Sequence, residues 1–477
     1  MNNKSAIELA QLVRSKSVSP VEILEAHLSA IAQANPAINA IVTLAADQAM
    51  HAARAAEQAV VDGRELGPLH GVPVGIKDVT PTAGIRTTYG SPLYADHVPD
   101  TDAEVVSRLK AAGAIVVGKT NTPEFATGAN TVNDVFGATR NPWDLRLTVG
   151  GSTGGGAAAV AARMLPLAEG TDVGCSLRVP ASYCGVVGLR PTAGVVPNSV
   201  EPQPWDVTTV HGPVARTATD VALMLDAMSG ASASSPISFD PPWQGSLAQL
   251  VEDTRDLHDV SIGYVADIAG LGVDPEVERV CRSAALRLAQ ARATVNEVTL
   301  DLSDGCDAYQ VLRGQWMASQ YADRLDRLDE FGPNLAGNIA AGLALSIREV
   351  AAAERTRAAI WHRLRSFFNQ HDLLLTPTVP VPPFPVEKNY PTEIGGRKLE
   401  NYTTWFASAF VISLVTLPAA SAPAGLTSSG LPVGIQIVGP RCAEPRILAC
   451  AKFIAGLNPI AIPPHAAITP LRTHSFA

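Results

Sequence analysis

The chain has 477 residues, of which 47% are hydrophobic and 17% charged, and its formal net charge at pH 7 is −9. A chain of this length exceeds the usual size of one compact core, so it predicts either one large domain with an elaborated second lobe or two domains. The acidic balance, without any cluster of Lys and Arg, excludes a surface for nucleic acid or for an anionic membrane.

The cysteines and the apolar segments indicate the compartment. Six cysteines lie far apart, without CxxC or Cys/His spacing: Cys175, Cys184, Cys281, Cys306, Cys442 and Cys450. This pattern favours free thiols in a reducing cytoplasm over disulfides or a zinc site. Residues 1–13 lack the basic start and apolar centre of a signal peptide, and the apolar run 406–425 contains two prolines, which favours a buried core segment over a membrane span. We therefore expect a soluble cytoplasmic protein.

The first elements in chain order are helical. Residues 5–61 carry apolar residues and alanines at helical spacing, which predicts an outer helical layer. Residues 71–78 (GVPVGIKD) then predict a strand, 101–112 an amphipathic helix and 114–117 (AIVV) a buried strand. A strand, a helix and a strand at this spacing predict a right-handed parallel unit.

The rest of the chain alternates in the same way. Short β-type runs occur at 258–265, 294–299, 372–376 and 433–438, and helical patterns lie between them at 216–228, 274–292 and 341–369. The alternation predicts an α/β fold with helices around a mixed sheet.

We predict a single domain over 1–477. Its expected parts are a helical layer (1–65), a core (66–228), a surface connection (229–258) and a second half that completes the sheet and the substrate pocket (259–477). Within the last part, the proline-rich stretch 377–401 predicts a long loop. Loops of that length usually have a function, and we expect a flap over the substrate.

One motif is rejected on physical grounds. Residues 113–120, GAIVVGKT, match the phosphate-loop pattern formally. The middle residues form a β-branched apolar strand, and 121–123 (NTP) follow in place of a helix. No backbone amides therefore converge on a phosphate, and we expect Lys119 to be an ordinary strand end.

A second motif gives an alternative. Ser152 and the surrounding glycines match the nucleophile elbow G-x-S-x-G of α/β-hydrolases, which also need an acid and a histidine later in the chain. Histidines are available later in the chain, but none of these lies in a recognisable turn motif: His211, His258, His362, His371 and His465. This esterase interpretation leaves GTDVGCS (170–176) unexplained.

A third interpretation uses two serines and a lysine. Six long motifs follow one another along nearly the whole chain: GVPVGIKD (71–78), GKTNTPEFA (118–126), GGSTGG (150–155), GTDVGCSLRVPASYCGVVGLRPT (170–192), GPVARTATDVALML (212–225) and PAGLTSSGLPVGIQIVGP (423–440). In these motifs the chain resembles the amidase signature family, serine hydrolases that cleave carbon–nitrogen bonds. The resemblance implies a bacterial-type amidase with that family's fold, a twisted mixed β-sheet covered by helices on both faces.

The resemblance implies that Ser176 is the nucleophile, Ser152 the proton relay and Lys77 the base, with a cis peptide bond before the relay serine. The chemistry has a separate basis, because an amide carbonyl is a poor electrophile and the attacking hydroxyl must lose its proton. Lysine accepts that proton only when it is neutral, which requires burial to lower its pKa. Lys77 follows the apolar VPVGI, which is consistent with burial; a solvated strand end is the alternative.

The glycine-containing turn before Ser176 predicts an oxyanion hole, since a tetrahedral intermediate needs two or more donors. By resemblance, the donors are the backbone amides of Val173, Gly174, Cys175 and Ser176. Asp172 and Arg178 match family positions that brace this turn, with a surface ion pair as the alternative, and Thr153 is expected to support the relay serine.

The chain departs from the family pattern at two positions. The family usually has glycine in place of Cys175 and serine in place of Gly156. We expect Cys175 to narrow the acyl pocket and Gly156 to open space. A nucleophilic role for Cys175 is the alternative, but a buried thiol without an activating base behaves as a small hydrophobe.

Further residues are assigned to the substrate by their place in the family. Phe125, Ala126 and Thr127 are neighbours of the acyl pocket, and the stretches 305–345 and 377–410 are expected to bound the leaving-group side. The expected substrates are uncharged linear amides, anilides (the reaction of an aryl acylamidase), and related esters and carbamates.

The sequence thus predicts a metal-free and cofactor-free amidohydrolase, a monomer or homodimer that acts on a small-molecule amide or carbamate. Neither nucleic acid nor a membrane is an expected partner. The alternative within the family is the glutamine-hydrolysing subunit of a tRNA amidotransferase, whose charged substrate contacts the sequence does not reveal. A non-catalytic binding protein on the same scaffold is the remaining alternative, and the intact Lys77, Ser152 and Ser176 argue against it.

Overall fold

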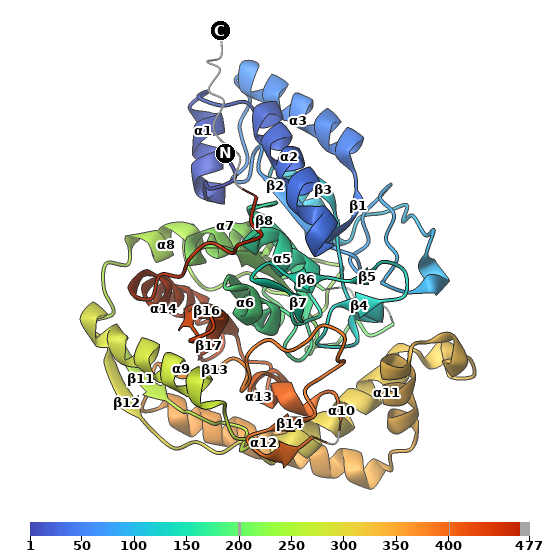
Figure 1. Ribbon diagram of the computed structural model, residues 1–477, viewed down its shortest axis with the longest axis vertical. Coiled ribbons are helices and arrows are strands. Elements are labelled where there is room, and N and C mark those ends of the chain that lie inside the picture. The colour runs from blue at the N-terminus through green and yellow to red at the C-terminus, as the bar shows by residue number, and fades with distance from the viewer. Residues whose placement is uncertain (199–201, 400, 468–477) are drawn as a thin grey trace.

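The computed structural model describes residues 1–198, 202–399 and 401–467 (Figure 1). Its centre is a mixed sheet of 11 strands. In spatial order these are β1 (Ile41–Leu44), β3 (Ile115–Thr120), β2 (Pro73–Lys77), β8 (Leu167–Asp172), β10 (Val210–Ala215), β9 (Val187–Arg190), β16 (Ala419–Leu426), β17 (Pro432–Val438), β13 (Leu373–Pro377), β11 (Ser261–Tyr264) and β12 (Thr294–Glu297). The last ten residues of the predicted domain, 468–477, lie outside the described part.

The sheet is parallel in two places. β2 pairs in parallel with both β3 and β8, and β11 does so with both β12 and β13, whereas the other neighbours are antiparallel. The parallel unit predicted from 71–117 is therefore confirmed. Short two-stranded ribbons lie outside the sheet: β4 (Val132–Asn133) with β5 (Gly137–Ala138), β6 (Arg140–Asn141) with β7 (Asp144–Thr148), and β14 (Glu393–Ile394) with β15 (Arg397–Lys398).

Helices cover the sheet. They are α1 (Ala6–Arg14), α2 (Pro20–Ile38), α3 (Ala46–Val61), α4 (Glu104–Ala111), α5 (Gly154–Ala161), α6 (Arg178–Cys184), α7 (Ala218–Met228), α8 (Leu247–Asp253), α9 (Pro275–Arg287), α10 (Gly305–Gln320), α11 (Pro333–Leu343), α12 (Ile347–Phe368), α13 (Ala407–Leu414) and α14 (Glu444–Leu457). Ser5, Ser19 and Ser346 each start a helix with a capping box, in which serine and a glutamate three residues later satisfy the free backbone donors.

Alternation along the strands decides which face each side chain joins. Val74 and Ile76 of β2 point into a core shared with α1, α4, α7, α8, α9 and α14. Other strand side chains point to the opposite face of the sheet, among them Ala168 of β8 and Leu374 of β13. They join cores that include residues of α2, α3, α5, α6, α10, α12 and α13. Because successive strand residues face opposite sides, Lys77 belongs to the second face, where α5 and α6 lie.

Two segments differ from the predictions. The helical layer at 5–61 is interrupted by β1, which is an edge strand of the sheet and pairs with β3, because hydrogen bonding to β3 outweighs the helical pattern of four residues. The connection at 229–258 contains the helix α8, which packs on α7. The prediction that the apolar run 406–425 is buried in the core is confirmed, because it forms the buried helix α13 and then most of β16.

Within the described residues, no single helix is long and apolar enough to cross a membrane. In the part of the chain that the structure describes, one pair of consecutive helices, α11 and α12, together reaches such a length and composition, and the two are bent by 104°. In Figure 1 the N-terminal helices α1–α3 lie at one end of the molecule and α10–α13 at the other.

Candidate active site

The three residues predicted for catalysis meet at one edge of the sheet. Lys77 is the last residue of β2, and Ser176 lies between the end of β8 and the start of α6. Because β2 and β8 run in parallel, their carboxyl ends lie side by side. Ser152 comes from the loop between β7 and α5, and the structure brings it against Lys77.

The side chain of Lys77 is completely buried. Its Nζ donates to the Ser152 Oγ at 2.6 Å and to the Thr171 Oγ1 at 2.8 Å, with the Thr171 carbonyl oxygen at 3.4 Å. Burial lowers the pKa of Lys77 from its usual value near 10.5 to about 7, although Glu169 and Asp172 act in the opposite direction. The amine is therefore poised to lose its proton near neutral pH.

The two serines differ in their exposure. Ser152, preceded by a cis peptide bond from Gly151, is almost completely buried. Ser176 is 8% exposed and lines a cavity, and its hydroxyl has no hydrogen-bond partner among the described residues. The backbone N–H of Thr153 donates to the Ser176 carbonyl at 3.1 Å, which ties the two serine loops together. The hydrogen bonds of the described residues include none between the two serine hydroxyls.

The loop 173–176 presents unused backbone donors. None of its four N–H groups has an acceptor within the described part of the chain. The carbonyl of Gly174 accepts from Arg178 at 2.6 Å and from Ser413 at 2.9 Å, and the carbonyl of Cys175 accepts from two N–H groups of α6. In a trans peptide the N–H points opposite to the carbonyl. These contacts therefore orient the N–H groups of Cys175 and Ser176 away from the donors that hold the two carbonyls.

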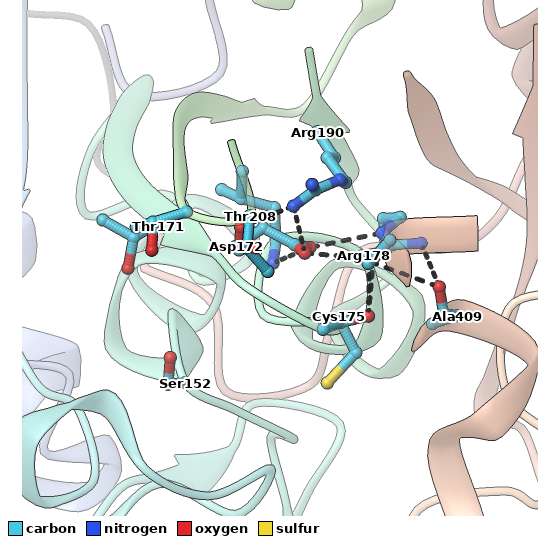
Figure 2. Close-up of polar contacts among 12 residues, drawn as sticks. Ser152, Thr171, Asp172, Cys175, Arg178, Arg190, Thr208 and Ala409 are labelled. Carbon is cyan, nitrogen blue, oxygen red and sulfur yellow. Dashed lines mark hydrogen bonds and ion pairs between the residues drawn. The ribbon is translucent and has the colours of Figure 1, made fainter. Parts of the chain in front are cut away.

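A buried ion cluster holds this loop in place (Figure 2). Asp172 accepts hydrogen bonds from Arg178 at 3.0 and 3.2 Å and from Arg190 at 3.2 Å, and all three side chains are completely buried. Burial alone would raise the pKa of Asp172, but the two guanidinium groups hold it below its usual value. Arg178 also reaches the carbonyl of Ala409 on α13 at 2.8 Å, so it joins the loop to a distant helix. The alternative of a surface ion pair is thus excluded.

The cavity in front of Ser176 has a volume of about 790 Å³. Phe125, Ala126 and Thr127 are among the residues that line it. Phe125 lies in an aromatic cluster, with ring centroids 5.7–6.0 Å from four other rings: Tyr89, Tyr94, Tyr321 and Phe331.

The two stretches expected on the leaving-group side behave differently. The stretch 305–345 contributes much of the wall through α10 and the residues after it, whereas 377–410 contributes Phe406. None of the described residues of the loop 377–401 lines this cavity. That loop packs elsewhere, with Asn130 donating to two of its carbonyls at 2.9 Å and Leu147 bridging to Pro385. The predicted flap is therefore not seen.

Sequence reasoning missed several residues around the site. Thr171 and Arg190 lie within quoted motifs, but nothing in the sequence separates them from their neighbours. His211 lines the cavity and its Nδ1 lies 2.7 Å from Glu169, which also accepts from the backbone N–H of Lys77 at 3.1 Å. Tyr309 reaches the site from α10, more than a hundred residues from Ser176 in sequence.

The two departures from the family pattern have structural consequences. Gly156 does not open space: a Cβ there would lie 3.0 Å from the Cβ of Ala168, so the glycine allows α5 to pack closely on β8. Cys175 lines the cavity, and its thiol lies 3.8 Å from the carbonyl of Gly151. Burial raises the pKa of this thiol far above its usual value, and a protonated thiol is a poor nucleophile.

The rejected motifs also have clear outcomes. The GKT segment is the strand β3, and Lys119 is not at a solvated strand end but is buried and donates to Thr80 and Thr82. For Ser152 the hydrogen-bonded base is a lysine and not a histidine, so the esterase elbow is not formed.

Comparison with known proteins agrees with this geometry. A family model described as Amidase matches residues 22–448. An acylamidase of Rhodococcus erythropolis is 35% identical over 462 residues, which cover 95% of each chain. A glutamyl-tRNA(Gln) amidotransferase subunit of Geotalea daltonii is 36% identical over 472 residues, covering 93% of this chain and 95% of that one.

Solved structures give the same result. A bacterial aryl acylamidase of the amidase signature family superposes with a TM-score of 0.88 at 28% identity, covering 96% of both chains. A 6-aminohexanoate cyclic dimer hydrolase, solved with its substrate, superposes with a TM-score of 0.86 at 28% identity and covers 97% of this chain and 99% of that one. The predicted fold is confirmed, and the chain belongs to the amidase signature family of amidohydrolases.

Proposed function

We propose that the protein hydrolyses linear amides and anilides through an acyl-enzyme on Ser176. The observation that carries the proposal is the hydrogen bond between the buried amine of Lys77 and the hydroxyl of Ser152. The other serine, Ser176, lines the cavity. The pKa of Lys77 near 7 supplies a neutral base under ordinary conditions. The similarity to two acylamidases supports the same chemistry.

In the proposed mechanism, Ser176 turns toward Ser152 and attacks the amide carbonyl carbon. Its proton passes to the hydroxyl of Ser152, which gives its own proton to the neutral Lys77. The free N–H groups of the loop 173–176 stabilise the negative oxygen of the tetrahedral intermediate. Asp172 and Arg178 position this loop, and Thr153 positions the relay serine.

The second half of the reaction reverses the proton path. The protonated Lys77 returns a proton through Ser152 to the departing nitrogen, so the C–N bond breaks as a neutral amine leaves. Water then attacks the acyl-enzyme with the same base, and the acid is released with Ser176 restored. Esters and carbamates react by the same steps: an ester differs from an amide in its leaving group, which is an alcohol, and a carbamate also differs in its acyl group, which carries a second heteroatom.

The aromatic cluster around Phe125 favours substrates with an aryl group. Edge-to-face contacts between rings contribute about 0.5–1.5 kcal/mol beyond the burial of their area. Ala126 and Thr127 lie beside this cluster and are proposed to contact the acyl portion.

The second candidate is a glutaminase that acts within a tRNA amidotransferase, as the similarity to such subunits suggests. Glutamine carries an ammonium group that needs a free carboxylate. The described carboxylates that line the cavity already have cationic partners: Asp102 with Lys110, Glu104 with Arg108, and Asp323 with Arg324. We therefore favour a hydrolase that acts without partner subunits.

The test uses the purified chain with 4-nitroacetanilide and, separately, L-glutamine. We expect release of 4-nitroaniline by the native chain and its loss in Ser176→Ala, with an unchanged circular dichroism spectrum. Ammonia release from glutamine without anilide hydrolysis would support the second candidate. Full anilide turnover by folded Ser176→Ala would overturn the assignment of the nucleophile.

A further inference from the structure

A second buried cation lies in the wall of the same cavity. Arg313 of α10 is 8% exposed and lines the cavity together with Ser176. Its guanidinium donates to three neutral oxygens: Nε to Asn338 at 3.1 Å, Nη1 to the Tyr309 hydroxyl at 3.3 Å and Nη2 to the Tyr402 hydroxyl at 3.0 Å. No described carboxylate forms an ion pair with it.

This arrangement differs from that of the other buried arginines at the site. Arg178 and Arg190 share the carboxylate of Asp172, which offsets the cost of removing their charges from water. Arg313 has no such partner, and an arginine cannot lower this cost by losing its proton. A buried charge without a counter-ion is expensive, so its retention at a substrate cavity points to an anion that arrives from outside.

The guanidinium also keeps the hydrogen-bonding capacity that an anion needs. It has five N–H groups, and three of them make the contacts above. One N–H therefore remains on each of Nη1 and Nη2. Two neighbouring N–H groups on the terminal nitrogens match the two oxygens of a carboxylate.

The cation lies close to the proposed reaction centre. The Tyr309 hydroxyl, which accepts from Arg313, packs so tightly on Gly174 that a Cβ there would lie 2.2 Å from its oxygen. The ring of Tyr309 is held by stacking on Phe410, with centroids 4.1 Å apart. Arg313 is thus separated from the loop that ends at Ser176 by a single hydroxyl group.

We propose that Arg313 binds a carboxylate of the substrate, so that the preferred substrates are amides carrying an anionic group near the scissile bond. This inference rests on the proposed amide hydrolysis at Ser176 and replaces the expectation of uncharged substrates. The described carboxylates of the cavity do not compete for Arg313, because their cationic partners lie elsewhere.

The test compares matched acidic and neutral substrates. On the acyl side, succinyl mono-4-nitroanilide is compared with 4-methylpentanoyl 4-nitroanilide, in which an isopropyl group replaces the carboxylate. On the leaving-group side, 4-acetamidobenzoate is compared with 4-acetamidobenzamide. For at least one of the two pairs, we expect kcat/KM of the acidic substrate to exceed that of its neutral match by about 10- to 100-fold. This ratio corresponds to the contribution of a charge-assisted hydrogen bond.

Arg313→Gln is expected to remove this preference and Arg313→Lys to restore part of it. The matched control is Arg324→Gln at the rim of the same cavity, where Asp323 already pairs with the arginine; the acid-to-neutral ratio should stay unchanged. If Arg313→Gln lowers kcat/KM equally for acidic and neutral substrates, Arg313 has a structural role only and the proposal is overturned. Equal rates for both members of both pairs in the native chain would also overturn it.

A binding measurement separates this inference from the proposed function. Calorimetry with Ser176→Ala and each acidic substrate reads the carboxylate contact without turnover. Binding that is lost in Ser176→Ala/Arg313→Gln supports the inference even if no amide is hydrolysed. Hydrolysis of neutral anilides with no effect of Arg313 on binding would refute the inference and leave the proposed function intact.

Discussion

The amine of Lys77 lies 2.6 Å from the hydroxyl of Ser152, and neither side chain has more than 1% of its surface exposed. The same amine donates to the hydroxyl of Thr171. Its position is therefore fixed by one hydroxyl group from the loop before α5 and one from the strand β8. Desolvation of this amine allows it to be neutral near pH 7 while it stays within proton-transfer distance of a serine.

The first prediction concerns pH. If neutral Lys77 is the base, kcat/KM should rise with pH, change slope near pH 7 and then stay level, because the amine is protonated below its pKa of about 7 and neutral above it. Initial rates of anilide hydrolysis between pH 5 and 10 measure this. A flat profile down to pH 5 would contradict it.

A histidine at the cavity needs a control for this profile. His211 lines the cavity, and its Nδ1 lies 2.7 Å from Glu169. His211→Asn should keep the rising limb if Lys77 is responsible. Disappearance of the rising limb in that variant would count against Lys77 as the base.

The second prediction compares two neighbouring positions of the loop before Ser176. Gly174→Ala should lower kcat by about 100-fold or more, because the new Cβ meets the Tyr309 hydroxyl and displaces the backbone donors. Cys175→Gly should stay active, because the thiol is protonated and makes only a weak contact with Gly151. Steady-state kinetics of both variants give the comparison, and complete inactivation of Cys175→Gly would reopen a role for the thiol.

The third prediction concerns stability. Arg178→Met should lower the free energy of unfolding by about 3–5 kcal/mol, because it leaves the buried Asp172 without its principal partner. Urea denaturation followed by circular dichroism measures this. The control is Arg282→Met in the exposed pair with Glu297, where the expected loss is below about 1 kcal/mol. Similar losses in the two variants would count against the bracing role of Arg178.

The fourth prediction concerns aryl selectivity. Phe125→Ala should lower kcat/KM for 4-nitroacetanilide about tenfold more than for an aliphatic acetamide, because ring contacts at the cavity wall are lost. Competition between the two substrates in one reaction measures the ratio directly. An equal effect on both would place the aryl group elsewhere in the cavity.

Local sequence determined much of the fold. The parallel unit at 71–117 follows from apolar runs separated by an amphipathic helix, and serine capping boxes begin three helices. Local patterns failed where distant chain segments supply the deciding contacts. The strand β1 exists because β3 offers a free edge, and the loop at 377–401 packs on Asn130 because that side chain donates to two of its carbonyls.

For the site, the resemblance of six ordered motifs to the amidase signature family predicted the roles of Lys77, Ser152 and Ser176, whereas the residues by themselves left a solvated strand end as an alternative for Lys77. The tertiary structure alone decided that Lys77 is completely buried, which lowers its pKa, and that Arg313 in the cavity wall has no carboxylate partner among the described residues. Both outcomes depend on segments far away in the chain: the apolar VPVGI before Lys77 is consistent with burial, but it does not exclude a solvated strand end.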